Sequence, residues 1–315
     1  MSDARPPVRL GVIGVGHLGR HHARLLSSME GVRLEAVVDI VPERAQAVAA
    51  ASGTEALTDA RGLFGRVDAV CVAVPTADHL EVARPFLEQG VSVLVEKPMA
   101  GSLAEADALC ELAASSGATL AVGHTERFNP AVQAALPLLR TPRFIEVHRL
   151  SGFPDRSLDI DVIFDVMIHD LDILLAVDPS EVASVEAVGV PVLTPKVDIA
   201  NARIRFASGC IANVTASRIS RDKVRKVRFF QPDMYVSIDY GDQELELWRL
   251  RRRDGGRPEI AGGKVPVEKD EPLRRELVDF AGALRDGRAP AVPGDAGRRA
   301  LALATRVADA IGHTG

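Results

Sequence analysis

The sequence predicts the α/β class, with an N-terminal doubly wound parallel sheet followed by an α+β domain that holds a large, mostly antiparallel sheet. In the first 125 residues, short apolar runs alternate with helical patterns, which is typical of a parallel sheet covered on both faces. In the second half, apolar and polar residues alternate, which is typical of an antiparallel sheet with one buried face. The length of 315 residues fits two domains of about 150 residues each.

Five apolar runs in the first half are predicted strands of the parallel sheet: Val8–Ile13, Leu34–Val38, Ala69–Val74, Val91–Val95 and Ala118–Val122. Helical patterns separate them, around residues 18–29, 42–52, 78–89 and 102–117. Pro42 in the first turn and Gly53 just past the end bound the second helix. Ser102 and Glu105 form a capping box that begins the fourth helix, and Gly117 ends it.

The second half begins with a helix-like apolar stretch, Ile163–Val177, and continues mainly as strands. The alternating segments that we predict to be strands are Ile199–Phe206, Cys210–Ser217, Val227–Phe230, Tyr235–Tyr240 and Glu244–Trp248. Their alternation predicts an antiparallel sheet with one buried face.

Composition and charge exclude several classes of protein. Hydrophobic residues make up 47% and charged residues 26% of the chain, which excludes a disordered or collagen-like chain. The net charge is −5 with no evident basic face, so we expect no binding to nucleic acid. No apolar run approaches the roughly 20 residues that span a bilayer, and the first residues lack the pattern of a signal peptide. Three widely spaced cysteines, Cys71, Cys110 and Cys210, favour a reducing compartment and offer no metal-ligand spacing, so we expect a cytoplasmic protein without a bound metal.

A glycine-rich motif, Gly14-Val15-Gly16-His17-Leu18-Gly19, lies between the first strand and the first helix. Asp39 ends the second strand, 20 residues after Gly19. Together they form the dinucleotide-binding fingerprint of a Rossmann domain, in which the helix N-terminus holds the pyrophosphate. A carboxylate at Asp39 accepts hydrogen bonds from the adenosine ribose and repels a 2′-phosphate, which favours NAD over NADP. Arg44 is nearby in the sequence, but we expect it to face solvent.

Further motifs follow in order: Val74-Pro75-Thr76-Ala77-Asp78-His79, Val93-Leu94-Val95-Glu96-Lys97-Pro98, Gly123-His124-Thr125-Glu126-Arg127-Phe128-Asn129-Pro130, Asp165-Val166-Met167-Ile168-His169, Glu276–Phe280 and Gly287-Arg288-Ala289-Pro290. In this set the sequence resembles the Gfo/Idh/MocA family, named after glucose–fructose oxidoreductase, inositol dehydrogenase and rhizopine catabolism. The resemblance implies a Rossmann domain over residues 1–123 and a substrate-binding and oligomerisation domain over residues 124–315, whose last helix can pack back on the first domain. It also implies an active site between the domains and a homodimer or homotetramer.

Two residues in these motifs have the chemistry of an alcohol dehydrogenase. Lys97 follows an apolar strand, at the end where open α/β sheets bind ligands, and its ammonium can stabilise charge on an alcohol oxygen as hydride leaves carbon. The resemblance implies this role and a cis Lys97–Pro98 bond. His169 is the expected general base. Asp165 lies four residues earlier on the same helix face and would stabilise the charged imidazole, with a helix-dipole role as the alternative.

The remaining candidate residues surround these two. We expect cofactor contacts from the loops that follow the strands, at Gly14, Gly16, His17, Leu18, Gly19, Asp39, Val74, Pro75, His79, Glu96 and Lys97. We expect substrate contacts from His124, Arg127, Asn129, Arg149 and Asp172. Hydrogen bonding between the domains is an equal alternative for Arg127 and Asn129, and helix capping is the alternative for His79. We interpret His21 and His22 as structural.

The resemblance implies an NAD-dependent dehydrogenase that oxidises a ring hydroxyl of a sugar. The approach to Asp165, residues 158–164, lacks the glycine-rich run of many members. Together with Gly123–Pro130 and Ile168-His169-Asp170-Leu171-Asp172, it looks most like the nucleotide-sugar branch. Members of this branch include UDP-N-acetylglucosamine 3-dehydrogenases, which make 3-keto sugars for lipid A biosynthesis. The alternatives are an inositol or monosaccharide dehydrogenase and a non-catalytic NAD-binding regulator. Two basic clusters, one at residues 218–226 together with Arg149 and Arg156 and one at residues 249–253, either contact an anionic substrate or lie exposed, at a sheet edge and a hairpin tip respectively.

Overall fold

The computed structural model describes residues 6–153, 160–251 and 259–312. Contacts divide the chain into two compact units. The first unit consists of Met1–His124 and Leu273–Arg298, and the second consists of Thr125–Pro272 and Arg299–Gly315. The chain therefore passes from the first unit to the second after His124 and adds a later segment to the first unit. The functions expected for the two domains stay predictions.

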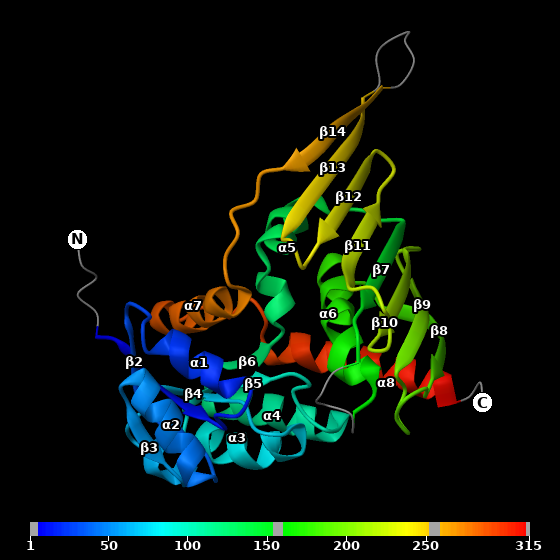
Figure 1. The fold of residues 1–315 in the computed structure, drawn as a ribbon. Helices are drawn as coiled ribbons and strands as arrows, with labels where there is room; N and C mark the ends of the chain where they lie inside the picture. Colours follow the sequence, from blue (N-terminus) through cyan, green and yellow to red (C-terminus); the bar gives the residue numbers. More distant parts are fainter. Residues whose placement is uncertain (1–5, 154–159, 252–258, 313–315) are drawn as a thin grey trace. The chain divides into compact units, whose positions relative to one another are not determined.

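The first unit is built on a parallel sheet of six strands (Figure 1). Its strands are β1 (Val8–Ile13), β2 (Val32–Val38), β3 (Glu55–Leu57), β4 (Ala69–Val72), β5 (Ser92–Glu96) and β6 (Leu120–Gly123). Their order is β3-β2-β1-β4-β5-β6, and every neighbouring pair is parallel. The predicted doubly wound sheet is confirmed, and β3 is a short strand that the sequence pattern did not reveal.

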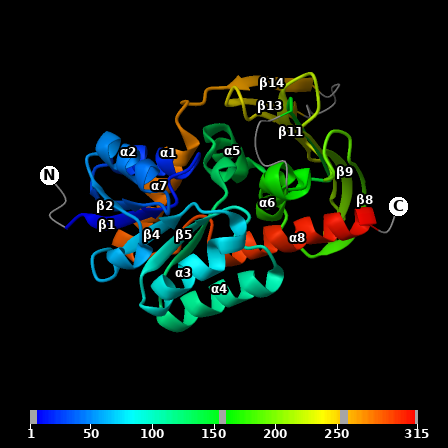
Figure 2. The same cartoon turned by 60° about the horizontal axis from the view of Figure 1, so that its bottom comes forward.

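Helices cover both faces of this sheet, as Figure 2 shows. They are α1 (Gly19–Leu26), α2 (Pro42–Ser52) and α7 (Pro272–Asp286) on one face, and α3 (His79–Glu88) and α4 (Leu103–Ser116) on the other, with 3₁₀ turns at Ala60–Leu63 and Thr76–Asp78. The core on the first face joins Leu10 of β1 and Leu26 of α1 to Phe280 of α7. Strands buried on both faces thus explain the continuous apolar runs of the sequence.

The expected helix boundaries are observed where the sequence carries capping signals. Helix α2 begins at Pro42 and ends before Gly53, which adopts a left-handed conformation with φ of 65°. The hydroxyl of Ser102 accepts a hydrogen bond from the backbone N–H of Glu105 at 3.3 Å, which satisfies a donor at the start of α4. The Glu105 carboxylate accepts from the N–H of Gly101 at 2.9 Å. Local sequence chemistry therefore determines these boundaries.

The second unit contains a sheet of eight strands (Figure 1). Its strands are β7 (Phe144–Leu150), β8 (Val182–Val190), β9 (Ile199–Phe206), β10 (Ile211–Ser217), β11 (Val224–Phe230), β12 (Met234–Asp239), β13 (Glu244–Arg251) and β14 (Glu259–Val265). The order is β14-β13-β12-β11-β7-β10-β9-β8, and only the pair of β7 and β10 is parallel among these described strands. The predicted mostly antiparallel sheet is confirmed, although β7, β8 and β14 were not expected individually.

Helices of the second unit pack on one face of this sheet (Figures 1 and 2). They are α5 (Pro130–Ala135), α6 (Ile168–Val177) and the later part of α8 (Gly294–Gly312), with short helical turns at Thr125–Phe128, Leu136–Leu138 and Ile163–Met167. The core joins Leu171 of α6 and Val307 of α8 to strand residues such as Val214 and Phe229. The helix expected over Ile163–Val177 is α-helical only from Ile168, because its first turn is a π-helix.

One expectation about the basic cluster at residues 218–226 is wrong. Strand β11 does not lie at a sheet edge, because it pairs with β12 on one side and with β7 on the other. Lys226 on this strand forms an ion pair with Asp239 of β12 at 3.2 Å. Arg156, Arg252 and Arg253, which belong to the two basic clusters, lie outside the described residues.

Candidate functional site

The glycine loop between β1 and α1 contains two glycines that the fold requires and one that it does not require. Gly14 has φ of 82°, and a Cβ there would lie 2.8 Å from the backbone of Ala73. A Cβ on Gly19 would lie 1.8 Å from the carbonyl oxygen of Gly14, so only glycine allows this close packing. A Cβ on Gly16, in contrast, meets no protein atom within 4 Å. The open backbone at Gly16, beside the N-terminus of α1, fits the approach of a dinucleotide pyrophosphate.

Asp39 immediately follows β2 and connects that strand to the glycine loop. Its Oδ2 accepts a hydrogen bond from the backbone N–H of Val15 at 3.0 Å, and its Oδ1 accepts one from the N–H of Val41 at 3.0 Å. Arg44 on α2 is exposed, as expected, and its guanidinium also donates to both carboxylate oxygens at 3.2 Å. The carboxylate is buried and anchored at the position where the fingerprint places the adenosine ribose.

The other loops at this edge of the sheet carry the remaining predicted cofactor residues of the first unit. His17 and Leu18 are exposed at the start of α1, and Val74 and Pro75 follow β4. His79, the first residue of α3, is buried, and its Nε2 lies 3.0 Å from the carbonyl oxygen of Val74. Burial lowers the pKa of His79, so the neutral ring donates this hydrogen bond. The contact holds the loop after β4 in place and is not a helix cap.

Lys97 immediately follows β5, and the peptide bond between Lys97 and Pro98 is cis. Its side chain is half-buried, whereas Glu96 before it is buried. Glu96 Oε1 lies 2.9 Å from Nε2 of His22 on α1, and Glu96 Oε2 accepts a hydrogen bond from the backbone N–H of Lys97 at 3.2 Å. Sequence reasoning missed the contact between His22 and Glu96, because no spacing rule relates residues 74 positions apart.

Asp165 and His169 lie at the start of the helical segment of the second unit. Asp165 is in the π-helical turn and His169 is in the first turn of α6, and both are half-buried. The expected placement of both on one α-helical face assumed α-helical spacing throughout, which the π-helical turn changes.

Two of the predicted substrate residues form an ion pair with each other. Arg127 Nε donates to Asp172 Oδ2 at 2.8 Å, and Arg127 Nη2 donates to Asp172 Oδ1 at 2.7 Å. Asp172 on α6 is only 1% exposed. The bidentate geometry makes this a strong contact that fixes α6 against the turn at Thr125–Phe128.

Arg149 on β7 is the centre of a second buried network. Its guanidinium forms two hydrogen bonds to Asp170 at 2.6 and 2.9 Å and one to Glu126 at 2.8 Å. It also lies over the ring of Tyr240, 4.7 Å from the centroid. Burial alone would lower the pKa of Arg149, but the charges of Asp170 and Glu126 outweigh it and hold the pKa well above its ordinary value. Arg149 is therefore a permanent cation inside the second unit.

Asn129 has an internal role of the same kind. Its Oδ1 accepts from the backbone N–H of Ala131 at 3.1 Å and caps α5, and its Nδ2 donates to the carbonyl of Tyr240 at 3.0 Å. These hydrogen bonds of Arg127 and Asn129 join residues of the second unit, so they differ from the expected alternative of hydrogen bonding between the domains. His124 lies buried just after β6, at the end of the first unit.

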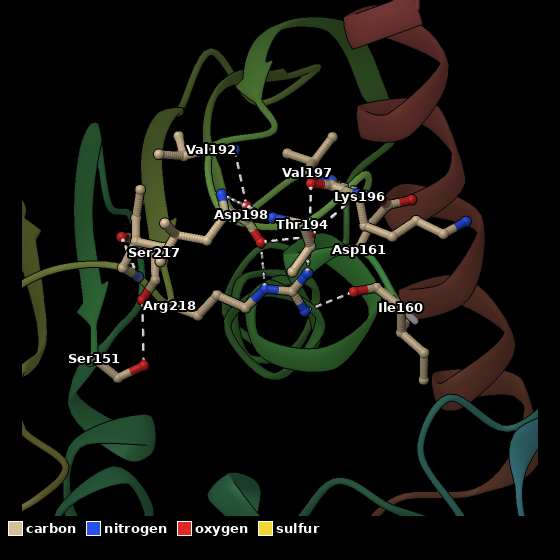
Figure 3. A network of polar contacts seen from close by, with 12 residues as sticks. Ser151, Ile160, Asp161, Val192, Thr194, Lys196, Val197, Asp198, Ser217 and Arg218 are labelled. Carbon is tan, nitrogen blue, oxygen red and sulfur yellow. Dashed lines mark hydrogen bonds and ion pairs between the residues drawn. The ribbon is translucent and has the colours of Figure 1, made fainter. Parts of the chain in front are cut away.

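Arg218, the first residue of the basic cluster at residues 218–226, is buried (Figure 3). Its Nε donates to Asp198 at 2.9 Å, and its Nη1 donates to the carbonyl of Ile160 at 2.7 Å. Asp198 also accepts hydrogen bonds from the backbone N–H groups of Val192, Leu193 and Thr194. This network fixes the chain just before the π-helical turn of Asp165, so the Arg218 guanidinium is held by contacts within the second unit.

The predicted site residues fall into two sets. The first unit brings together the glycine loop, Asp39 and the loops after β4 and β5 at the carboxyl ends of parallel strands. The second unit contains Arg127, Asn129, Arg149, Asp165, His169 and Asp172. Among the described residues, no cluster of His, Cys, Asp or Glu suits a metal ion. In the same part of the chain, every helix is too short or too polar to cross a membrane.

A glycine loop with open backbone at a helix N-terminus, an anchored carboxylate at the end of β2 and a lysine after β5 define an NAD-binding oxidoreductase. Residues 8–124 match the model of the oxidoreductase family with an NAD-binding Rossmann fold. The chain is 40% identical to UDP-N-acetylglucosamine 3-dehydrogenase of Acidithiobacillus ferrooxidans over 96% of this chain and 97% of that one. The chain therefore belongs to the Gfo/Idh/MocA family, as the motifs indicated, and is an NAD-dependent oxidoreductase that acts on a CH–OH group.

Two further comparisons agree with this assignment. A solved structure of UDP-N-acetylglucosamine 3-dehydrogenase from Acidithiobacillus ferrooxidans is similar with a TM-score of 0.91 and 39% identity, covering 98% of both chains. The scyllo-inositol 2-dehydrogenase of Bacillus subtilis is 28% identical over 90% of this chain and 88% of that one. Similarity thus extends over both units and not only over the Rossmann domain.

Proposed function

We propose that this protein oxidises the 3-hydroxyl of UDP-N-acetylglucosamine to the 3-keto sugar with NAD as hydride acceptor, as a step of lipid A-type biosynthesis. The observation that carries this proposal is the similarity to a UDP-N-acetylglucosamine 3-dehydrogenase at 40% identity over 96% of the chain. The similarity to an inositol dehydrogenase is lower, at 28% identity over 90% of the chain. The comparison over nearly the whole chain therefore favours the nucleotide sugar over a free cyclitol.

The proposed chemistry assigns one task to each unit. NAD supplies the acceptor for the hydride that leaves the sugar carbon. Lys97 of the first unit donates a hydrogen bond to the reacting oxygen and stabilises the negative charge that develops on it. His169 of the second unit accepts the hydroxyl proton as the general base. Asp165 stabilises the imidazolium that results. The products are the ketone, the reduced cofactor and a proton held by His169.

The proposed cofactor contacts follow the geometry of the first unit. The backbone at Gly16 and the N-terminus of α1 bind the pyrophosphate, beside His17 and Leu18. Asp39 accepts hydrogen bonds from the adenosine ribose. The loops that carry Val74, Pro75 and the pair Glu96–Lys97 line the nicotinamide end. His79 contacts the carbonyl oxygen of Val74 and so holds the loop after β4 that lines the nicotinamide end.

The proposed substrate contacts are His124, Arg127, Asn129, Arg149 and Asp172. For Arg127, Arg149 and Asp172 this proposal carries a condition, because each already forms a bidentate ion pair inside the second unit. A substrate must therefore join these pairs or replace them. Opening a buried ion pair leaves a desolvated charge, so joining is the less costly course.

We propose a homodimer or homotetramer in the cytoplasm. The three cysteines, Cys71, Cys110 and Cys210, are all free, which suits a reducing compartment. The eight-stranded sheet of the second unit provides the surface for self-association. Size-exclusion chromatography with light scattering measures the assembly directly, and a monomer at micromolar concentration would refute this part of the proposal.

The decisive experiment compares substrates under one condition. The purified protein is mixed with NAD and with UDP-N-acetylglucosamine, myo-inositol or glucose, and nicotinamide absorbance is followed. Alcohol oxidation by NAD is unfavourable near neutral pH, so hydroxylamine is added to trap the ketone. We expect reduction of NAD only with the UDP-sugar, and none in His169→Ala. Reduction with a free polyol, or no reduction despite NAD binding, would contradict the proposed substrate.

A further inference from the structure

A buried contact between a histidine and a carboxylate lies next to Lys97. His22 on α1 is 0% exposed and Glu96 at the end of β5 is 6% exposed, and the imidazole Nε2 lies 2.9 Å from the carboxylate Oε1. Because an ionised carboxylate only accepts hydrogen bonds, the imidazole donates this one. Helix α1 thus connects the glycine loop at its start to the strand that ends at Glu96, just before Lys97.

The second carboxylate oxygen of Glu96 contacts the lysine that follows it. Glu96 Oε2 accepts a hydrogen bond from the backbone N–H of Lys97 at 3.2 Å, and the Lys97 ammonium acts on the carboxylate electrostatically. Burial alone would raise the pKa of Glu96, but the hydrogen bond and charge of His22 outweigh it and hold the pKa below its ordinary value. The other titratable groups that act on this carboxylate are His79 of α3 and the buried thiol of Cys71 on β4.

The neighbouring strand leaves room for this arrangement. Gly123 of β6 pairs in register with Glu96. A Cβ on Gly123 would lie only 3.0 Å from Glu96 Oε2, so a larger residue would push the carboxylate away. A glycine at this register position fits a carboxylate that must keep one orientation.

We propose that the His22–Glu96 pair is a positioning device for Lys97: His22 fixes the Glu96 carboxylate, and the carboxylate fixes the backbone of Lys97 and attracts its ammonium group. This inference rests on the catalytic role proposed for Lys97. Because His22 acts through Glu96 and Glu96 acts through Lys97, both are positioning residues. Desolvation offsets much of the stability that such a buried contact provides, which makes a positioning role the stronger explanation of its place beside Lys97.

Three variants separate positioning from simple packing. Glu96→Gln keeps the shape and removes the charge, His22→Leu removes the donor, and His22→Gln restores a donor at a similar distance. In the oxidation of UDP-N-acetylglucosamine, we expect kcat to fall about 10- to 100-fold in the first two variants, with the KM for the sugar within about threefold. We expect His22→Gln to recover most of the loss. The double variant His22→Leu/Glu96→Gln should be no slower than Glu96→Gln, because both changes remove the same effect.

The pH profile of kcat is a readout that a merely structural role would not move. In His22→Leu, burial of Glu96 is no longer compensated and its pKa rises, so an acidic limb should appear about one pH unit or more above that of the wild type. Glu96→Gln cannot titrate at this position and should lack the added limb. The proposal would be overturned if kcat fell by the same factor at every pH in both variants. It would also be overturned if the variants had a lower Tm but a normal kcat.

A second measurement needs no turnover, so it separates this inference from the proposed reaction. Acylation of Lys97 by acetic anhydride is followed by peptide mass spectrometry in the NADH-bound protein at fixed pH. Glu96→Gln removes the charge that attracts the Lys97 ammonium group and loosens its hold on the side chain, so we expect labelling to be about tenfold faster in this variant. Equal labelling rates would refute the electrostatic part of the proposal. If Glu96→Gln is labelled faster but the wild-type protein oxidises none of the sugars, the positioning of Lys97 is supported and the proposed reaction is rejected.

Discussion

The Asp39 carboxylate accepts a hydrogen bond from the backbone N–H of Val15 at 3.0 Å. This contact joins the end of β2 to the glycine loop, across 24 residues of sequence. In the proposed mode of cofactor binding, this loop receives the pyrophosphate and the carboxylate faces the adenosine ribose. We therefore expect Asp39 to affect both the affinity for NAD and the discrimination against NADP.

Substitution of Asp39 should separate these two effects. Asp39→Asn keeps the size and removes the charge, and we expect the Kd for NADH to rise about 10- to 100-fold, since hydrogen bonds to a charged group contribute about 1.5–3 kcal/mol. The Kd for NADPH should fall relative to that for NADH, because the repulsion of the 2′-phosphate is lost. Fluorescence titration with both cofactors measures the change. An unaltered ratio of the two affinities would contradict the role of Asp39.

The glycine loop allows a matched pair of alanine variants. Gly16→Ala meets no protein atom within 4 Å, so the fold should be unchanged while the methyl group blocks the pyrophosphate. We expect NADH binding to weaken at least about tenfold with a normal Tm. Gly19→Ala places a methyl group 1.8 Å from the carbonyl oxygen of Gly14, and both the Tm and NADH binding should fall. Normal NADH binding by Gly16→Ala would show that the pyrophosphate lies elsewhere.

The proposed catalytic residues should affect turnover and not cofactor binding. In Lys97→Met and in His169→Ala we expect kcat for UDP-N-acetylglucosamine to fall about 10²- to 10⁴-fold, with the Kd for NADH within about threefold. Steady-state kinetics and fluorescence titration give the two quantities. His21→Ala serves as a control, because this half-buried histidine on α1 has no proposed role in the reaction. Activity within tenfold of the wild type in either catalytic variant would refute the role of that residue.

The buried network of Arg149 makes a prediction about stability. Arg149→Met leaves the Asp170 carboxylate buried without its cation, which costs about 3–5 kcal/mol. Urea denaturation should show this loss, and Arg149→Met/Asp170→Leu should recover part of it because both charges are then absent. Arg61→Met is the control, since its exposed pair with Asp59 should leave the urea midpoint unchanged. A neutral effect of Arg149→Met would show that Asp170 is solvated or protonated.

Asp198 makes a prediction about pH. Burial alone would raise its pKa, but the backbone N–H groups of Val192 and Thr194 outweigh it and hold the pKa below the ordinary value. The ionised carboxylate therefore stabilises the fold above about pH 4, the pKa of an unfolded Asp, and this stabilisation is lost as the pH falls further. Asp198→Asn should have a lower Tm at pH 7, with a difference that shrinks below about pH 4. A difference that is the same at both pH values would contradict this account.

Much of the fold could be predicted from local patterns. The strand Val8–Ile13 and the helix Pro42–Ser52 have the predicted bounds, because apolar runs and capping residues act over a few positions. The glycine loop and Asp39 could be predicted equally well, since the tight turn and the close approach of the backbone to a pyrophosphate require glycine at given spacings. The strand β7 was not predicted individually, and its parallel partner β10 lies more than sixty residues further along the chain.

The sequence by itself determined the two-domain α/β architecture, the NAD fingerprint and the identity of the candidate catalytic side chains. Only the tertiary structure decided which charged residues are buried. Arg218 and Arg149 looked like candidates for binding an anion, yet the fold places them against Asp198 and Asp170. It also paired His22 with Glu96. Charged side chains carry no periodic signal of burial, because a buried charge depends on a partner that long-range packing brings within hydrogen-bond distance.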